Sequence, residues 1–465
     1  MAAAKPGRVR TAPRATTTLA AQPWPALFAA TLALYVAVVV GRVHEAVPFV
    51  ARLYLGKTSA LALIAAAVFQ LRGRDFSLLF KTSTARALMV ITGIGLISVP
   101  FSYWPSQSLG FFENQWPQTI LMFACVAVGF TNRRTALLCI IALVATASLG
   151  AIQLNLGGGP DIGGRVFIGN GLSQTYDPNQ SAAFFVMVLP YVVVLASRKG
   201  VLRWFAIPLI PVFVSALLKT DSRGGTVALG ALAVAFLFVA NKRQRKAFLV
   251  LFPLVAMTLV LMPHSSIMER FSELTGGSDY NLTSRDGRWP IWQHGFSLML
   301  THPIGVGIGA YEAANAVTSG SWKTAHNAYI QIGVELGVGG LIAFFVAIRG
   351  AFRSGWKVRA ATAPGASNDD DELRPFDRLL ATAALCSLVG ELTAAIFLSM
   401  AYDAMTLFTF AVPTGLALTV VGTEVNKRVV ARAPSGRAAG WRSARRPAPQ
   451  PSQPVHATSA ARARV

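Results

Sequence analysis

The stretch "TAHNAYIQIGVELGVGG", residues 324–340, places a histidine and an asparagine directly before a glycine-rich apolar run. An imidazole has an ordinary pKa near ~6.5, so His326 can accept a proton at neutral pH and act as a general base. A second interpretation makes the pair a helix start, in which Asn327 accepts hydrogen bonds from free backbone N–H groups. Both interpretations put His326 at the threshold of an apolar helix.

Cationic residues occur in two other segments that we expect at the same level. "LKTDSRGG" contains Lys219 and Arg223, and "SRDGRWPIW" contains Arg285, Arg288 and Trp292. In a helix, a residue and the fourth one after it share a face, which would place Trp292 beside Arg288. Guanidinium groups bind phosphate oxygens through paired hydrogen bonds, so this set suits an anion such as a lipid pyrophosphate. The alternative use of the arginines is ion pairing with Asp221 and Asp286.

Glu335 lies inside the apolar run, where a carboxyl group is costly and is therefore a functional candidate. Nine positions separate it from His326, which is about 900° of rotation in a continuous helix. We therefore expect Glu335 to point away from the imidazole, and a structural hydrogen bond to another helix is an equally good role.

Composition identifies the kind of protein that must position these residues. Of 465 residues, 53% are hydrophobic and 13% are charged, and the mean hydropathy is +0.50. The apolar residues form continuous blocks long enough to cross a hydrocarbon layer of roughly 30 Å. The net charge of +22 comes from basic residues in short loops and in both tails, which is typical of membrane topology. We predict an all-α polytopic membrane protein with no nucleic-acid partner.

About twelve transmembrane helices are predicted, at 24–41, 47–70, 85–101, 117–131, 135–154, 180–197, 202–219, 223–241, 246–262, 327–349, 378–400 and 404–422. The block at 47–70 is the weakest of them because it carries Arg52 and Lys57. If the N-terminus is cytoplasmic, the basic loops all face inward: "LRGRDFSLLFKTSTAR", "TNRRT", "SRKGVLR" and "NKRQRK". The first three outer segments contain at most one basic residue each, which sets the orientation.

This orientation divides the chain into five parts. They are a basic cytoplasmic tail at 1–23, helices one to nine at 24–262, a periplasmic loop with the active-site motifs at 263–326, helices ten to twelve at 327–422 with a cytoplasmic loop at 351–377, and a disordered basic cytoplasmic tail at 423–465. We expect the protein in a bacterial inner membrane, with both termini cytoplasmic and the site periplasmic.

Other patterns suggest sites that the context does not support. "GVGIGA", residues 305–310, lacks the strand and helix of a nucleotide-binding loop, and we expect a turn packed against the membrane. His294, His302 and His326 do not have the spacing of a zinc site. "DDDE" at 369–372 falls on the cytoplasmic side, so we predict neither a metal nor a cofactor. The three cysteines lie in apolar blocks and should be buried thiols: Cys125, Cys139 and Cys386.

The chain resembles the superfamily of O-antigen ligases and O-antigen polymerases, which are polytopic membrane glycosyltransferases. The resemblance rests on five features: "DPNQSAAF" at 177–184, "SRGG" at 222–225, Arg288 with Trp292, "HPIGVGIGAY" at 302–311 and "HNAYIQIGVELGVGG" at 326–340. It implies a GT-C-type helical fold and a metal-independent, inverting transfer of a glycan from undecaprenyl pyrophosphate on the periplasmic face.

The resemblance also implies roles for individual residues. His326 would be the base, and Arg223 and Arg288 would hold the pyrophosphate, with Arg285 close to the second of them. We add Lys219 to this cationic group. Five further residues are expected to support the site: Asp177, Asn179, Trp292, Asn327 and Glu335.

We therefore predict a ligase of lipopolysaccharide biosynthesis that joins a lipid-linked polysaccharide to an acceptor such as lipid A–core. A polymerase of the same superfamily, whose acceptor is another lipid-linked glycan, would need the same base and the same pyrophosphate site. A lipid flippase or solute transporter is the alternative of another class. A transporter should line a path through the bilayer with polar groups, whereas the charged candidates here gather at one interface.

Overall fold

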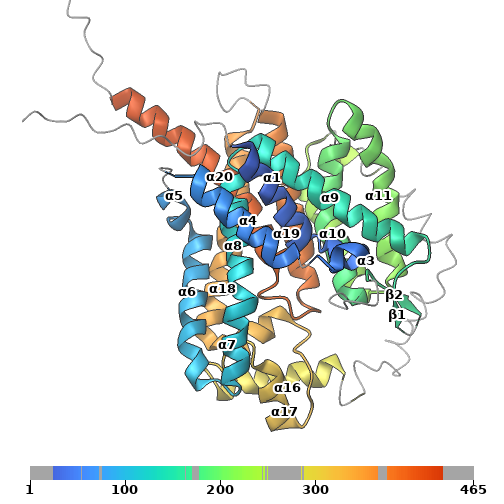
Figure 1. Ribbon diagram of the computed structural model, residues 1–465, viewed down its shortest axis with the longest axis vertical. Helices are drawn as coiled ribbons and strands as arrows, with labels where there is room; N and C mark the ends of the chain where they lie inside the picture. The colour runs from blue at the N-terminus through green and yellow to red at the C-terminus, as the bar shows by residue number, and fades with distance from the viewer. Residues whose placement is uncertain are drawn as a thin grey trace, which may run out of the picture. The chain divides into compact units, whose positions relative to one another are not determined.

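The structure is a computed structural model that describes residues 25–432, except 54, 73–75, 163, 170–176, 243, 247–248, 250–283, 285–286 and 365–373. The chain forms two units, Met1–Thr423 and Glu424–Val465, and the site lies in the first. Helices dominate the described residues (Figure 1), as predicted for an all-α membrane protein. The strands β1 (Asp161–Ile162) and β2 (Arg165–Val166) pair in antiparallel fashion as a small hairpin.

Helices occupy every predicted span except 246–262, which lies outside the described residues. The first group is α1 (Ala26–Tyr35), the π-helical η1 (Val36–Val40), α2 (Val43–Ala46), α3 (Pro48–Ala51), α4 (Leu55–Gln70), α5 (Ser77–Phe80), α6 (Ser83–Ser98), the 3-10 turn η2 (Val99–Phe101), α7 (Pro105–Asn114), α8 (Trp116–Gly129) and α9 (Arg133–Asn155). The second group is α10 (Pro178–Ala196), α11 (Val201–Lys219), α12 (Arg223–Val239), α16 (Arg288–Thr301), α17 (Tyr311–Ser319), α18 (Ala328–Ala361), α19 (Arg374–Ala394) and α20 (Ala404–Arg432).

Five of the described helices are long and apolar enough to cross a membrane: α6 with η2, α9, α10, α11 and α18. Shorter apolar helices cover Ala26–Val40, Leu55–Gln70, Arg223–Val239 and Ala404–Val420. The three cysteines lie in the helical core and are buried thiols, as predicted. The chain is thus a helical membrane protein, and the number of twelve crossings stays a prediction.

The predicted helix at 47–70 is wrong in extent. Pro48 starts the short helix α3, which ends at Ala51, and α4 begins only at Leu55. The 16 residues of α4 rise about 24 Å, which is short of the roughly 30 Å of a hydrocarbon layer. Arg52 lies between the two helices, and its charge is costly inside a membrane span, which gives a reason for the break.

Helices also extend into a predicted cytoplasmic loop and into the predicted C-terminal tail. The cytoplasmic loop 351–377 was placed too early, because α18 continues to Ala361 and α19 begins at Arg374. Ala351, Gly355 and Val358 are buried at helical spacing, so this charged segment is an amphipathic extension of α18 and not a loop. The tail predicted to be disordered from 423 is likewise helical as far as Arg432, and 433–465 lie outside the described residues.

Three contacts between helices can be compared with the side of the membrane predicted for each helix end. On the predicted outer side, Asn155 at the end of α9 donates to the carbonyl of Val212 in α11 at 2.9 Å, and Arg42 after η1 pairs with Asp403 before α20 at 2.8 Å. On the other side, Arg133 at the start of α9 donates to Asp377 near the start of α19 at 2.8 Å. These contacts fit helices that alternate in direction, and the topology of the chain stays a prediction.

A break in α18 shapes the end of the bundle where the site lies. Gly337 has φ +65° and ψ −165° within otherwise helical residues, and the loop after α16 fills the gap. Three backbone hydrogen bonds join loop and helix: Val306 N–H to Val334 O at 2.9 Å, Gly307 N–H to Glu335 O at 3.0 Å, and Val338 N–H to Pro303 O at 3.0 Å. These bonds satisfy the groups that the break frees, as a membrane environment demands. The "GVGIGA" segment is therefore a turn, as predicted, and it packs into a broken helix.

Candidate active site

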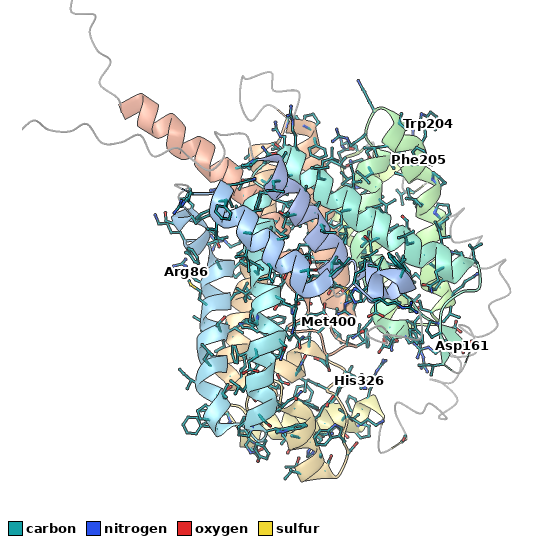
Figure 2. The ribbon with its side chains drawn as sticks, viewed as in Figure 1. Arg86, Asp161, Trp204, Phe205, His326 and Met400 are labelled. Atoms are coloured by element: carbon teal, nitrogen blue, oxygen red, sulfur yellow. The ribbon has the colours of Figure 1, made fainter. Side chains whose placement is uncertain are left out.

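His326 lies in the short segment between α17 and α18, with its backbone in the left-handed region at φ +46°. This conformation costs a non-glycine residue about 1–2 kcal/mol, so the flanking residues must hold it. The indole N–H of Trp292 donates to the carbonyl of Ala325 at 3.1 Å, and the N–H of Ala328 donates to the carbonyl of Ala395 at 2.8 Å. The backbone on both sides of the imidazole is thus fixed. Figure 2 shows His326 between α16 and the α19–α20 link, which contains Met400.

Asn327 is the N-cap of α18, as expected from the sequence. Its side-chain oxygen accepts hydrogen bonds from the N–H groups of Tyr329 at 2.9 Å and Ile330 at 3.0 Å. The helix therefore starts one residue after the asparagine, and His326 stands outside it. A partly exposed imidazole at this point is accessible to a substrate, which a general base requires.

Three charged side chains act on the imidazole of His326. Burial lowers its pKa most, the charge of Arg288 lowers it further, Asp177 raises it and Lys323 lowers it, and the resulting pKa falls from 6.5 to about 4. His326 is therefore a neutral imidazole at physiological pH, in the protonation state that a base needs. Arg288 and Asp177 are far from His326 in the sequence, so the fold brings them here, whereas Lys323 lies three positions before it.

Trp292 supports the site from α16, one helical turn after Arg288. Ile291 and Leu298 of the same helix are buried in a cluster with Ala325 and Ile330. This packing sets the position of α16 against α18, and the Trp292 hydrogen bond then ties α16 to the residue before His326.

The start of α12, where Arg223 is the first residue, contacts the α19–α20 link. Gly224, next to it in α12, lies so close to Phe397 that a Cβ there would be 3.0 Å from the Phe397 side chain. The ring of Phe397 in turn faces the ring of Trp292, with 6.4 Å between the centroids. The start of α12 and the start of α16 therefore contact the same aromatic residue.

Asp177 and Asn179 organise neighbouring helix starts. Asp177 caps α10 by accepting a hydrogen bond from Gln180 N–H at 2.7 Å. Asn179 accepts one from the hydroxyl of Ser222 at 2.9 Å, and Ser222 itself caps α12 at Gly225 N–H. The α10 and α12 starts are thereby joined beside Arg223.

The helix α18 begins two residues after His326, and Arg288 of α16 and Asp177, the cap of α10, act on the charge of its imidazole. The start of α12 is joined to that of α10 through Ser222 and Asn179. Arg223 and Arg288 are the first residues of α12 and α16. The positive end of a helix dipole and its unpaired N–H groups favour an anion. Two guanidinium groups placed at such ends make this region of the protein suited to a phosphate or pyrophosphate.

The structure gives one predicted cationic residue, Lys219, another set of contacts. The ammonium group of Lys219 donates to the carbonyls of Asn155 at 2.9 Å and Leu154 at 3.4 Å, so it closes the end of α9. We therefore remove Lys219 from the anion site. Arg285 lies outside the described residues.

Glu335 contacts the inserted loop and the α19–α20 link. It is 2% exposed, its carboxylate accepts a hydrogen bond from Tyr311 N–H at 3.4 Å, and the Tyr402 hydroxyl lies beside it. His326 precedes α18, so a rotation of about 900° along one helix does not relate it to Glu335. The contacts of Glu335 support a structural role, in which it holds the loop in the α18 break.

Sequence reasoning missed Arg165, Lys323 and Phe397. Arg165 is the single basic residue of its outer segment, and the argument applied to the other outer arginines would have found it. Lys323 lies three positions before His326 and acts on its charge. Phe397 carries no signal in the sequence, because only the fold brings it to Trp292.

The histidines that might have formed a metal site have separate partners. His294 Nε2 bonds to the Thr318 hydroxyl at 2.7 Å, and His302 Nε2 bonds to the Tyr103 hydroxyl at 3.0 Å. Within the described ranges, no group of three or more His, Cys, Asp or Glu side chains is arranged to hold a metal ion. The acidic stretch 369–372 is outside those ranges.

Comparison with known proteins identifies one segment. Residues 209–345 match the family model described as O-antigen ligase. This segment runs from α11 into α18 and contains Arg223, Arg288 and His326. No curated protein matches the chain. The resemblance noted from the sequence motifs is therefore confirmed.

Proposed function

We propose that this chain, a membrane protein of the O-antigen ligase superfamily, transfers a glycan from a lipid pyrophosphate carrier to an acceptor hydroxyl. The carrier would be undecaprenyl pyrophosphate, the acceptor lipid A–core or a similar glycan, and the site would face the periplasm of a bacterial inner membrane. The observation that carries the proposal is that Arg288 acts on the neutral imidazole of His326, while the start of α12, which carries Arg223, is joined to α10 through Asn179 and contacts Phe397 beside Trp292.

The reaction forms one bond and breaks another at the anomeric carbon of the donor glycan. The acceptor oxygen attacks that carbon from the face opposite the pyrophosphate, so the configuration inverts. The hydroxyl proton passes to His326, and the carbon–oxygen bond to the pyrophosphate breaks. Lipid pyrophosphate leaves with the electron pair of that bond, and the imidazolium later returns its proton to water.

Arg223 and Arg288 would stabilise the pyrophosphate as its charge grows. Preorganised cations at low dielectric do this well, and removing one such group typically costs about 10²–10³ in rate. The helix N-termini beneath the two arginines add to the same effect. These groups supply the role that a divalent cation has in many sugar transferases, which supports a metal-independent mechanism.

Binding of the donor would also activate the base. An anion next to an imidazole favours its protonated form and so raises its pKa. In the free protein, burial and then the charge of Arg288 keep the pKa of His326 low. When the pyrophosphate neutralises that charge, His326 becomes a stronger base at the moment a substrate is present. This predicts that the donor binds before the acceptor reacts.

The experiment that tests the proposal uses purified protein in proteoliposomes with an undecaprenyl-linked glycan. One reaction receives lipid A–core and a second receives only further lipid-linked glycan. Glycan on lipid A–core supports the ligase, and longer lipid-linked chains support the polymerase of the same superfamily. If neither product forms and the intact donor crosses the bilayer, the protein acts as a flippase and the proposal is refuted.

A further inference from the structure

Arg165, the first residue of β2, lies beside the proposed site without belonging to the matched segment 209–345. Its guanidinium donates hydrogen bonds to two other elements. Nη2 donates to the side-chain oxygen of Asn179 in α10 at 2.9 Å, and Nε donates to the carbonyl of Thr220 at 3.3 Å. One side chain thus bridges α10 and the turn between α11 and α12.

The hairpin that carries Arg165 is fixed to the helical bundle. Phe167 and Ile168, directly after β2, are 1% and 3% exposed. The N–H of Ile168 donates to the Ser181 hydroxyl in α10 at 3.1 Å, and the Gln153 amide donates to the carbonyl of Gly169 at 2.6 Å. The backbone that carries Arg165 is therefore held in place, so its guanidinium can fix the positions of Asn179 and Thr220.

Both partners of Arg165 lie next to the start of α12. Thr220 is fully buried and is followed by Asp221 in the left-handed region at φ +49°. Asn179 also accepts the hydrogen bond of Ser222, the N-cap of α12. The two bonds of Arg165 consequently fix the residues immediately before Arg223.

We propose that Arg165 is a positioning residue, which holds the α11–α12 turn against α10 and thereby aims Arg223 at the donor pyrophosphate. The inference rests on the proposed function. It makes Arg165 act through Arg223 and gives it no contact with the substrate. A planar guanidinium suits this task because it donates in two fixed directions, which a lysine ammonium does not.

Replacing Arg165 should slow glycan transfer, because Arg223 would no longer be held where it stabilises the charge of the departing pyrophosphate. A displacement of about 1 Å in an active-site group can cost on the order of 10²-fold in rate. We expect Arg165→Gln to lower kcat/KM for the donor about tenfold or more. Because Arg223 acts mainly on the departing pyrophosphate, the loss should appear chiefly in kcat.

A double-mutant cycle separates positioning from other roles. Arg165→Gln is made in the wild type, in Arg223→Ala and in Arg288→Ala, and kcat/KM is measured for each. Residues that act through one another give non-additive losses, whereas independent residues give multiplicative ones. We expect the full loss in the wild type and in Arg288→Ala, and less than about twofold further loss in Arg223→Ala.

Equal losses in all three backgrounds would overturn the inference, because a general destabilisation or a direct ligand contact does not depend on Arg223. Arg165→Lys, which keeps the charge but not the two-directional donation, undergoes the same cycle with the same criterion if the glutamine variant does not fold. Arg203→Gln is the matched control, since Arg203 is an exposed arginine near the other end of α11. If the wild type transfers no glycan, the proposed function fails, whereas equal losses with an active wild type refute only the role of Arg165.

Discussion

The pKa of His326 should change in a known direction when its charged neighbours are altered. Burial and the charge of Arg288 lower the pKa, Asp177 raises it, and Lys323 lowers it by the smallest contribution. Replacing a cation by a neutral residue removes repulsion of the imidazolium, so Lys323→Gln and Arg288→Gln should raise the pKa. Asp177→Asn removes an attraction and should lower it, while asparagine can still cap α10.

The size of the effect on activity follows from the pKa of about 4. At pH 5.5, a histidine with a pKa of 6.5 is about 10% neutral, whereas one with a pKa near 4 is about 97% neutral. If the neutral imidazole is the base, kcat/KM should stay nearly flat down to about pH 5. An ordinary histidine with a pKa of ~6.5 would lose about tenfold by pH 5.5 and about thirtyfold by pH 5.

The assay is kcat/KM for the lipid-linked donor between about pH 4 and pH 8, in the wild type and in the variants. Lys323 is exposed and outside the pyrophosphate site, so Lys323→Gln should move the acid limb upward without a large loss at pH 7.5. The acid limb of the kcat profile reports the donor complex, and it should occur at a higher pH than the acid limb of the kcat/KM profile. An acid limb near pH 6.5 in the wild type, unmoved by Lys323→Gln and Asp177→Asn, would refute the electrostatic reasoning.

Four further outcomes are expected. Gly337→Ala should destabilise the protein by about 3 kcal/mol or more, because φ is +65° and the added Cβ meets the Pro303 carbonyl. Gly339→Ala is the control and should be tolerated, since its Cβ meets only an Ile94 methyl. Thermal melting in detergent compares the two variants. His326→Gly should melt higher than His326→Ala, since glycine is free of the left-handed penalty of about 1 kcal/mol, and equal melting temperatures would contradict the strain. Trp292→Phe removes the bond to Ala325, worth about 1 kcal/mol, and should lower kcat several-fold while the protein folds normally; an unchanged kcat would argue against this support. Transfer should survive exhaustive chelation, and a strict requirement for a divalent ion would contradict the metal-independent mechanism.

The sequence predicted helices well because each depends on local composition. Apolar blocks and their flanking basic loops located the helices within a few residues, and Asn327 was recognised as a helix start. The predicted helix ends were wrong where a helix continues through a segment with charged residues. The segment after residue 350 carries Arg353 and Lys357 on one face and buries Ala351 and Gly355 on the other, so charge alone indicated a loop.

The candidate site was predicted in its residue types but not in its distances. Arginines on an outer side that should lack them pointed to Arg223 and Arg288, and the same signal at Arg165 went unused. Lys219 shows the limit of such reasoning, because its ammonium group donates hydrogen bonds to backbone carbonyls at the end of α9. Phe397 and the break at Gly337 depend on contacts between segments far apart in sequence, which no local pattern encodes.

The most direct test of the central claim is glycan transfer by His326→Ala in proteoliposomes, measured together with binding of the undecaprenyl-linked donor. We predict that the variant binds the donor with nearly wild-type affinity and transfers glycan about 10²–10⁴-fold more slowly, as expected when a general base is lost. Wild-type transfer by this variant would show that the imidazole is not the base and would contradict the account.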